Sequence, residues 1–456
     1  MRATFLAKHR SPPGPRGEFF LGTLKEFRKS PQRFLLRVAR DYGDVARYRN
    51  AFWSTYFFAH PEHIRHILQD NSNNYSKDTF AWRNIRPAFG KGLLTSDGER
   101  WRRQRRLMQP AFHQRRLQAL ATTITSATAG LMDGWEPIAA RGRPVDVSAE
   151  MMKLTLEVMG KALFSSDLRA ETGTINDAAT GILEFFKHQV TASLPLPHWI
   201  PTSHARRFRA SMSRFHEVVQ RIIESRKARS EWPDDLLSML MSARDEDSGE
   251  GMSGEQLHDE LITMLFAGYE TTATALSWAW YFLSTHPEAA ARLRSELRTI
   301  LAGRPPGYGD LARLDFTRMV VQETMRLLPP VWVATRKAIA DDEIGGYVVP
   351  ANTVVTFSSY VTHRRADLWE NPEEFQPERF SPARMSGMPR YSYFPFGGGP
   401  RQCIGNNFAM VEAQLILAAV AQRYSLDLVP SHPVEPLPLG ILRPRYGLLV
   451  TLRRAG

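Results

Sequence analysis

Hydrophobic side chains recur at helical spacing along much of the chain. Where apolar residues return every three to four positions, a helix can bury one face and expose the other. This pattern predicts helices within residues 34–38, 117–131, 151–163, 208–223, 258–283, 289–301 and 408–424. Several of these stretches exceed the length of an average helix, which predicts a large helical body.

The stretches with strand character are short and far apart. They predict strands at residues 45–48, 55–58, 347–349, 354–357 and 448–452. Because they do not alternate regularly with helices, they indicate small sheets beside a helical body rather than a βαβ fold. The predicted fold class is therefore mainly α with small β-sheets.

Nothing in the pattern divides the chain. Residues 1–17 end in a proline-rich lead-in, SPPGPRG, where proline fixes the backbone and disfavours a helix. Residues 364–400 are rich in proline, arginine and aromatic residues and lack periodicity, as long irregular segments with a function often do. With no repeat or linker, residues 1–456 are expected to form a single domain.

Composition and charge narrow the class of protein. With 43% hydrophobic and 23% charged residues, the chain can bury a sizeable core. Its formal net charge of +12 favours an acidic partner, which can be a nucleic acid, an anionic membrane or an acidic protein. A single cysteine excludes an intramolecular disulfide, and no apolar run is long enough for a signal peptide or membrane span. These features predict a cytoplasmic protein without a transmembrane anchor.

The one cysteine, Cys403, lies in the sequence FGGGPRQCIG at residues 396–405. A thiol is a good metal ligand only as the thiolate, which nearby positive charge favours. An apolar helix is predicted to follow directly, so its N-terminal N–H groups are expected to point at the sulfur. The glycines allow a tight turn and remove side chains where a flat cofactor would approach. Cys403 is therefore a candidate metal ligand.

The spacing Phe396-x-x-Gly399-x-Arg401-x-Cys403-x-Gly405 resembles the haem-binding loop of the cytochrome P450 family. The resemblance implies a cytochrome P450 fold that holds haem b, iron protoporphyrin IX, with the Cys403 thiolate as axial ligand. It also implies that Phe396 and Gly405 lie beside the haem and that Arg401 contacts a propionate.

A second motif lies in the long predicted helix, at Ala267-Gly-Tyr-Glu270-Thr271-Thr. Glycine and other small residues in a buried helix permit close approach of a ligand, and a buried acid is unfavourable without a function. Taken alone, the motif also fits a helix with a tolerated glutamate. The resemblance implies that Ala267 lies against the distal face of the haem. It also implies that Glu270 and Thr271 handle protons for bound dioxygen.

Two further motifs contain arginines. Glu323 and Arg326 are three residues apart on a predicted helix, a spacing that also suits an ordinary surface pair. The resemblance implies that Arg379 joins them in a buried structural cluster.

The stretch Trp101-Arg-Arg-Gln-Arg105-Arg fits either a nucleic-acid patch or a solvated helix face. The resemblance instead implies that Trp101 and Arg105 contact a haem propionate together with Arg336 and Arg401. It places Arg102, Arg103 and Arg106 on the face where an electron donor docks.

The family resemblance implies a haem-thiolate monooxygenase. One atom of dioxygen, the co-substrate, enters a hydrophobic small molecule of the terpenoid, steroid, fatty acid or polyketide class. Because the chain lacks a dinucleotide-binding motif, the electrons are expected from a separate ferredoxin or flavodoxin-type donor and its reductase. The resemblance implies that the substrate is enclosed by a loop at residues 77–94, the helix around Ala267, a lid at residues 183–205 and residues 330–334. The candidate pocket residues are Phe80, Trp82, Phe185, Phe186 and Val333.

Two other classes of function compete with this interpretation. One is a haem-thiolate isomerase, dehydratase or haem-based binding protein that does not activate dioxygen. The complete Ala-Gly-x-Glu-Thr-Thr stretch argues against it. The other is nucleic-acid binding through residues 101–106, which the presence of every P450 motif in family order disfavours; no nucleic-acid partner is expected.

Overall fold

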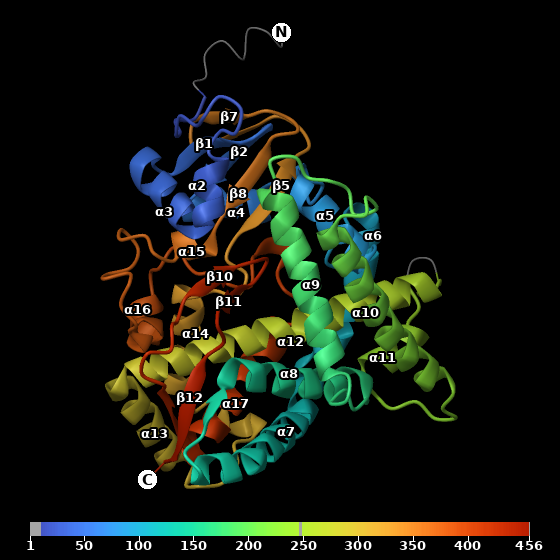
Figure 1. Ribbon diagram of the computed structural model, residues 1–456, viewed down its shortest axis with the longest axis vertical. Coiled ribbons are helices and arrows are strands. Elements are labelled where there is room, and N and C mark those ends of the chain that lie inside the picture. The colour runs from blue at the N-terminus through green and yellow to red at the C-terminus, as the bar shows by residue number, and fades with distance from the viewer. Residues whose placement is uncertain (1–10, 246–248, 456) are drawn as a thin grey trace.

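The computed structural model describes residues 11–245 and 249–455 (Figure 1). The α-helices are α2 (Leu24–Lys29), α3 (Pro31–Tyr42), α4 (Pro61–Arg65), α5 (Phe80–Phe89), α6 (Gly98–Met108), α7 (Gln114–Ala140), α8 (Val147–Phe164), α9 (Thr172–Thr191), α10 (Ser203–Lys227), α11 (Leu236–Ser242), α12 (Gly254–Thr285), α13 (Pro287–Leu301), α14 (Asp315–Leu327), α15 (Ser359–Thr362), α16 (Pro382–Met385) and α17 (Asn406–Arg423).

The strands are β1 (Val45–Asn50), β2 (Trp53–Phe58), β3 (Tyr75–Ser76), β4 (Pro144–Asp146), β5 (Ala334–Ala338), β6 (Asp342–Ile344), β7 (Tyr347–Val349), β8 (Val354–Phe357), β9 (Tyr424–Leu428), β10 (Pro436–Pro438), β11 (Leu442–Pro444) and β12 (Leu449–Arg454). The fold is mainly helical with small sheets, which confirms the predicted fold class. Each predicted helix and strand overlaps an observed one.

The long helix α12 crosses the middle of the molecule (Figure 1). It begins where the Ser253 side chain accepts a hydrogen bond from the backbone N–H of Gln256, and it ends before Pro287 starts α13. Buried residues occupy every side of its central turns, as expected for a helix surrounded by others. It packs on α8, α10, α14 and α17, so side chains from several parts of the chain meet around it.

The largest sheet lies at the end of the molecule that also holds α2 and α3 (Figure 1). Its strand order is β1-β2-β8-β5-β3, with β2 and β8 parallel and the other pairs antiparallel. Strand β5 carries Thr335 and Arg336 on opposite faces, because neighbouring residues of a strand alternate in direction. The smaller sheets are β4-β12-β9, β6-β7 and β10-β11.

The segments expected to surround a substrate contain more helix than the sequence pattern indicated. Residues 77–94 were expected as a loop, yet residues 80–89 form α5, which is capped where the Thr79 hydroxyl accepts from the N–H of Trp82 at 3.4 Å. Residues 183–205 were expected as a lid, and only residues 192–202 lie between α9 and α10. Residues 364–400 remain irregular apart from short helical turns.

Candidate active site

The loop that carries Cys403 is a tight turn before α17. The backbone N–H of Cys403 donates to the carbonyl of Phe396 at 3.0 Å. Gly399 has a φ of +64°, and a Cβ there would lie 1.8 Å from the carbonyl oxygen of Leu68. Only glycine fits this position, because a side chain would clash with backbone that cannot move aside.

The Cys403 side chain is accessible, although it lies deep within the fold. Helix α17 begins at Asn406, so Cys403 precedes the helix rather than lying in its first turn. Desolvation raises the pKa of the thiol, and the N–H of Gly405 and the charge of Arg105 oppose this only in part. Coordination to a metal ion would supply the missing charge, since a coordinated thiol loses its proton.

The predicted propionate residues Trp101, Arg105 and Arg401 meet next to this loop. Arg401 lies over the Trp101 ring, with its guanidinium carbon 4.4 Å from the ring centre. It donates to the carbonyl of Ser96 at 2.9 Å and to the carboxylate of Asp97. Arg105 donates to the carbonyl of Gln402 at 2.8 Å, which ties α6 to the cysteine loop.

A buried cluster of cations extends from Arg401 to Arg336 and Lys77. Burial and the charge of Arg401 lower the pKa of Arg336 to about 10. Burial, with Arg336 and Arg401 nearby, lowers the pKa of Lys77 well below its usual value. Within the described part of the chain, only Asp97 supplies a carboxylate to these three side chains. The excess of buried positive charge suits a dianionic group, such as the two propionates of haem.

Sequence reasoning missed Lys77. Its ammonium group donates to the carbonyl of Leu94 at 2.6 Å and lies 4.5 Å from the centre of the Trp82 ring. Nothing in the local sequence distinguishes this lysine from a surface lysine, because the cluster forms only when distant parts of the chain come together.

Glu270 and Thr271 are neighbours on α12 but have different partners. Glu270 is fully buried and pairs at 2.5 Å with Nε of Arg443, from β11. Arg443 also donates to the Thr180 hydroxyl of α9 at 3.2 Å, while Oε2 of Glu270 has no hydrogen-bond partner. Half-buried Thr271 donates to the carbonyl of Ala267, one turn earlier, at 2.8 Å. Arg443, which fixes Glu270, was not predicted.

The glycine of this motif has a packing role that the sequence did not reveal. A Cβ at Gly268 would lie 2.2 Å from the side chain of Met159, on α8. The absent side chain makes room for the neighbouring helix.

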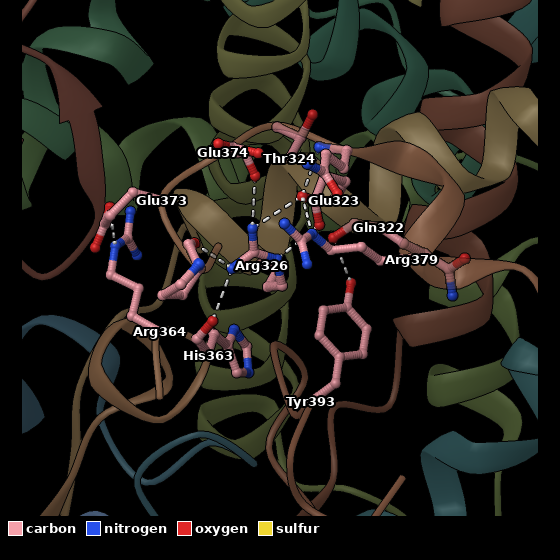
Figure 2. A network of polar contacts seen from close by, with 12 residues as sticks. Gln322, Glu323, Thr324, Arg326, His363, Arg364, Glu373, Glu374, Arg379 and Tyr393 are labelled. Carbon is pink, nitrogen blue, oxygen red and sulfur yellow. Dashed lines mark hydrogen bonds and ion pairs between the residues drawn. The ribbon is translucent and has the colours of Figure 1, made fainter. Parts of the chain in front are cut away.

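Glu323, Arg326 and Arg379 meet in a buried network, as Figure 2 shows. The two nitrogens Nε and Nη2 of Arg326 contact the two carboxylate oxygens of Glu323 at 2.7 and 2.8 Å. Arg326 also donates to the carbonyls of His363, Pro372 and Glu374 at 2.8, 2.7 and 3.0 Å. Arg379 completes the network with Nε 3.3 Å from Glu323.

The network continues toward the cysteine loop through His363. The ring nitrogen Nε2 of His363 accepts from the backbone N–H of Phe394 at 2.9 Å, two residues before the loop. Helix α14 is thereby connected to the irregular segment and to the start of the loop, through backbone carbonyls that no sequence motif identifies.

Three of the five candidate pocket residues line one cavity. Phe80, Phe186 and Val333 border a cavity of about 250 Å³ between the large sheet, α9 and the β10-β11 hairpin. Trp82 donates to the carbonyl of Thr335, which also borders this cavity, at 3.2 Å. Phe185 lies apart from it, stacked on Phe208 in the core between α9 and α10 with ring centres 4.3 Å apart. In the described ranges no helix is long and apolar enough to span a bilayer.

Comparison with known proteins identifies the family. The cytochrome P450 family model matches residues 12–452. The chain is 37% identical to cyclooctatin synthase and 34% identical to cyclooctat-9-en-7-ol 5-monooxygenase, both of Streptomyces melanosporofaciens, over 90% of this chain and 88% of each relative. It is 31% identical to pentalenene oxygenase of Streptomyces avermitilis over 96% of both chains. The chain therefore belongs to the cytochrome P450 family and is a P450 monooxygenase.

Proposed function

We propose that the protein is a haem-thiolate monooxygenase that inserts one oxygen atom of dioxygen into an apolar small molecule of the terpenoid class. The observation that carries this proposal is the accessible thiol of Cys403 beside a buried cluster of cations that has too few acids. The terpenoid class rests on the names of the relatives, cyclooctatin synthase and pentalenene oxygenase, and on the apolar cavity.

In this proposal the residues of the site would hold haem b. Cys403 would bind the iron, with Phe396 and Gly405 beside the ring. The propionates would be neutralised by Arg105, Arg336 and Arg401, to which we add Lys77, with Trp101 next to them. When bound, a haem with a thiolate ligand supplies the activation of dioxygen.

In this proposal, side chains of α12 carry out the proton transfer. Arg443 holds Oε1 of Glu270 in an ion pair, and Oε2, which has no hydrogen-bond partner among the described residues, can exchange a proton with a neighbouring group. The Thr271 hydroxyl is held by the carbonyl of Ala267 and can rotate to donate elsewhere. We assign Glu270 to proton transfer and Thr271 to the hydrogen bond that directs the proton. Glu323, Arg326 and Arg379 have a structural role.

The electrons come from a separate protein in this proposal. The chain is strongly basic, which suits an acidic ferredoxin or flavodoxin-type donor.

The first test is the absorption spectrum of the reduced, carbon-monoxide-bound protein beside a Cys403→Ser variant. A strongly red-shifted Soret band that is lost in the variant supports thiolate ligation by Cys403. A haem-loaded wild type without that band would overturn the proposal.

A second test separates the oxygenase from an isomerase or binding protein. Thr271→Ala is expected to raise the electrons consumed per product formed. Thr271→Ser, which keeps the hydroxyl, and Thr272→Ala, the neighbouring threonine, serve as controls. If Thr271→Ala left coupling unchanged, a reaction without dioxygen activation would be favoured.

A further inference from the structure

We propose that the substrate carries a negatively charged head group, which the mouth of the cavity beside Phe186 and Val333 recognises. This inference rests on the proposed function, because it takes that cavity as the substrate site. It narrows the proposed substrate from an apolar molecule of the terpenoid class to one that has an apolar body and one anionic end.

The walls of the cavity are apolar on several sides. Phe27 and Leu35 come from α2 and α3, and Phe80, Phe186 and Trp332 come from three other segments. Such walls favour a hydrophobic body through the apolar surface removed from water. They give no orientation to the ligand, since dispersion and hydrophobic contacts are not directional.

Charged residues at the border of the same cavity are all positive. They are Arg28, Lys29, Lys187 and Arg445, and among the residues that the structure describes no aspartate or glutamate borders the cavity. Arg445 pairs with Glu435 at 3.1 Å. Over the described ranges, neither Lys29 nor Lys187 has an acid within ion-pair distance. Two lysines therefore have no acidic partner at the border of an apolar cavity.

Arg28 connects the two segments that carry these lysines. Arg28, at the end of α2, donates to the carbonyl of Thr191 and, at 2.8 Å, to the Ser193 hydroxyl just after α9. These contacts fasten α2 to the end of α9 that reaches the strand-rich part of the molecule (Figure 1). Lys29 follows Arg28, and Lys187 lies one turn before Thr191. The cavity mouth is thus a fixed feature of the fold.

An anion at this mouth would interact more strongly than at an open surface. Charge-assisted hydrogen bonds are stronger than neutral ones, and apolar walls reduce screening by water. A head group bound here would fix which end of the apolar body points inward. Trp82 donates to the carbonyl of Thr335, which borders the cavity, and its ring contacts Lys77 of the cation cluster. This side of the cavity therefore lies close to the candidate haem site, and an apolar body that fills the cavity would approach it.

The test compares three ligands that share one skeleton: a diterpenoid carboxylic acid, its methyl ester and its alcohol. Binding is measured by calorimetry and by the haem spin-state shift at low and high salt. The acid is expected to bind about tenfold more tightly than the ester or alcohol, with the advantage reduced at high salt. Lys29→Gln combined with Lys187→Gln should remove the advantage without weakening ester binding.

The matched control is Lys25→Gln. Lys25 lies on the same helix as Lys29, but it pairs with Glu18 at 2.9 Å and is not part of the cavity border. This variant should leave the preference for the acid intact. A diterpenyl phosphate serves as a fourth ligand, and lysine-dependent binding of it alone would assign the head group as a phosphate ester.

The inference would be overturned if the ester bound as tightly as the acid, or if the double variant kept the preference for every anionic ligand. Its failure is distinguishable from failure of the proposed function. Calorimetry reports the anion preference independently of haem ligation, and the carbon-monoxide spectrum reports ligation independently of the head group.

Discussion

At the scale of single residues, three buried carboxyl groups near the centre of the molecule differ in their partners. Glu270 has Arg443, and Glu323 has Arg326 and Arg379. Glu412, on α17, faces no cation among the described residues. Its polar neighbour is the Thr272 hydroxyl, which donates to the carbonyl of Gly268 at 3.3 Å. An unpaired buried carboxylate is strongly disfavoured, so such a group stays protonated.

Glu412 provides a prediction for pH dependence. Burial raises the pKa of Glu412 to about 8, whereas the unfolded chain has an ordinary glutamate. Between the pKa of the unfolded chain and that of the folded chain, the folded state binds more protons. The contribution of Glu412 to the free energy of unfolding is therefore complete below about pH 4 and is lost as the pH rises through about 8. We expect Glu412→Gln, which is neutral at every pH, to remove this loss and to raise the melting temperature at pH 8.

The measurement is thermal unfolding of both proteins from pH 6 to pH 9. Plotted against pH, the melting temperatures of the two proteins should converge toward pH 6 and separate toward pH 9. The separation should correspond to about 1–3 kcal/mol in free energy of unfolding. A parallel offset at every pH would mean that Glu412 is ionised in the folded protein.

His363 predicts the opposite dependence. Burial lowers the pKa of His363 to about 3, helped by the charge of Arg326, while the unfolded chain titrates near 6.5. The contribution of neutral His363 to the free energy of unfolding is therefore present above about pH 6.5 and is lost as the pH falls toward 3. His363→Gln keeps an acceptor for the N–H of Phe394 and is expected to flatten the fall in melting temperature between pH 7 and pH 5. His432→Gln, a histidine near the C-terminal strands that contacts the carbonyl of Gly447 at 3.2 Å, should leave the slope unchanged.

At the scale of elements, α14 stabilises a segment that has little regular structure. Residues 363–380 offer few strand or helix bonds of their own, and Arg326 satisfies three of their carbonyls. A planar guanidinium can contact a carboxylate and three carbonyls at once, whereas a lysine cannot. The Glu323-Arg326 pair therefore orders the connection that leads to the cysteine loop.

We expect Arg326→Lys to lower stability by about 3–5 kcal/mol, because it leaves buried acceptors without donors. Haem content after purification should fall as well, since the cysteine loop loses its support. Unfolding curves and the ratio of Soret to protein absorbance measure the two effects. Arg318→Lys is the control on the same helix, where a half-buried arginine pairs with the exposed Asp315 at 2.7 Å. Equal effects of the two substitutions would show that the network has no special role.

At the scale of the whole molecule, the sequence predicted the fold class and the site motifs better than the contacts of the site. Periodicity located α12 and α17 because each buries a long apolar stretch. It did not indicate α5, which contains Pro87 and two arginines. Arg443 lies 173 positions from Glu270, and Lys77 joins Arg336 only through the folded sheet. Such pairings depend on tertiary structure, so no local pattern contains them.

The arginines of α6 differ in their contacts with the rest of the chain, and this affects which of them suit a test of electron-donor docking. Arg106 pairs with Asp245 at 2.9 Å, and Arg103 donates to the carbonyls of Glu250 and Gly251. Both arginines thus contact the chain itself, and Arg103 is half-buried, whereas Arg106 stays exposed. Arg100 and Arg102 are exposed as well, and Arg102 pairs with Glu99 on the same helix. Arg105 fastens this helix to the cysteine loop.

Arg100→Glu combined with Arg102→Glu is therefore the sharper test of donor docking. An acidic donor approaches a basic face faster because long-range attraction raises the association rate. We expect the double variant to slow reduction by an acidic ferredoxin by about tenfold at low ionic strength. The difference should shrink as salt screens the charges, and substrate affinity should not change.

The matched control has the same change in net charge at exposed arginines of α10 and α13, Arg206→Glu with Arg298→Glu. If the control slowed reduction equally, the net charge of +12 would steer the donor without a defined face. If neither variant altered the rate or its salt dependence, electrons would enter through a surface that does not include α6.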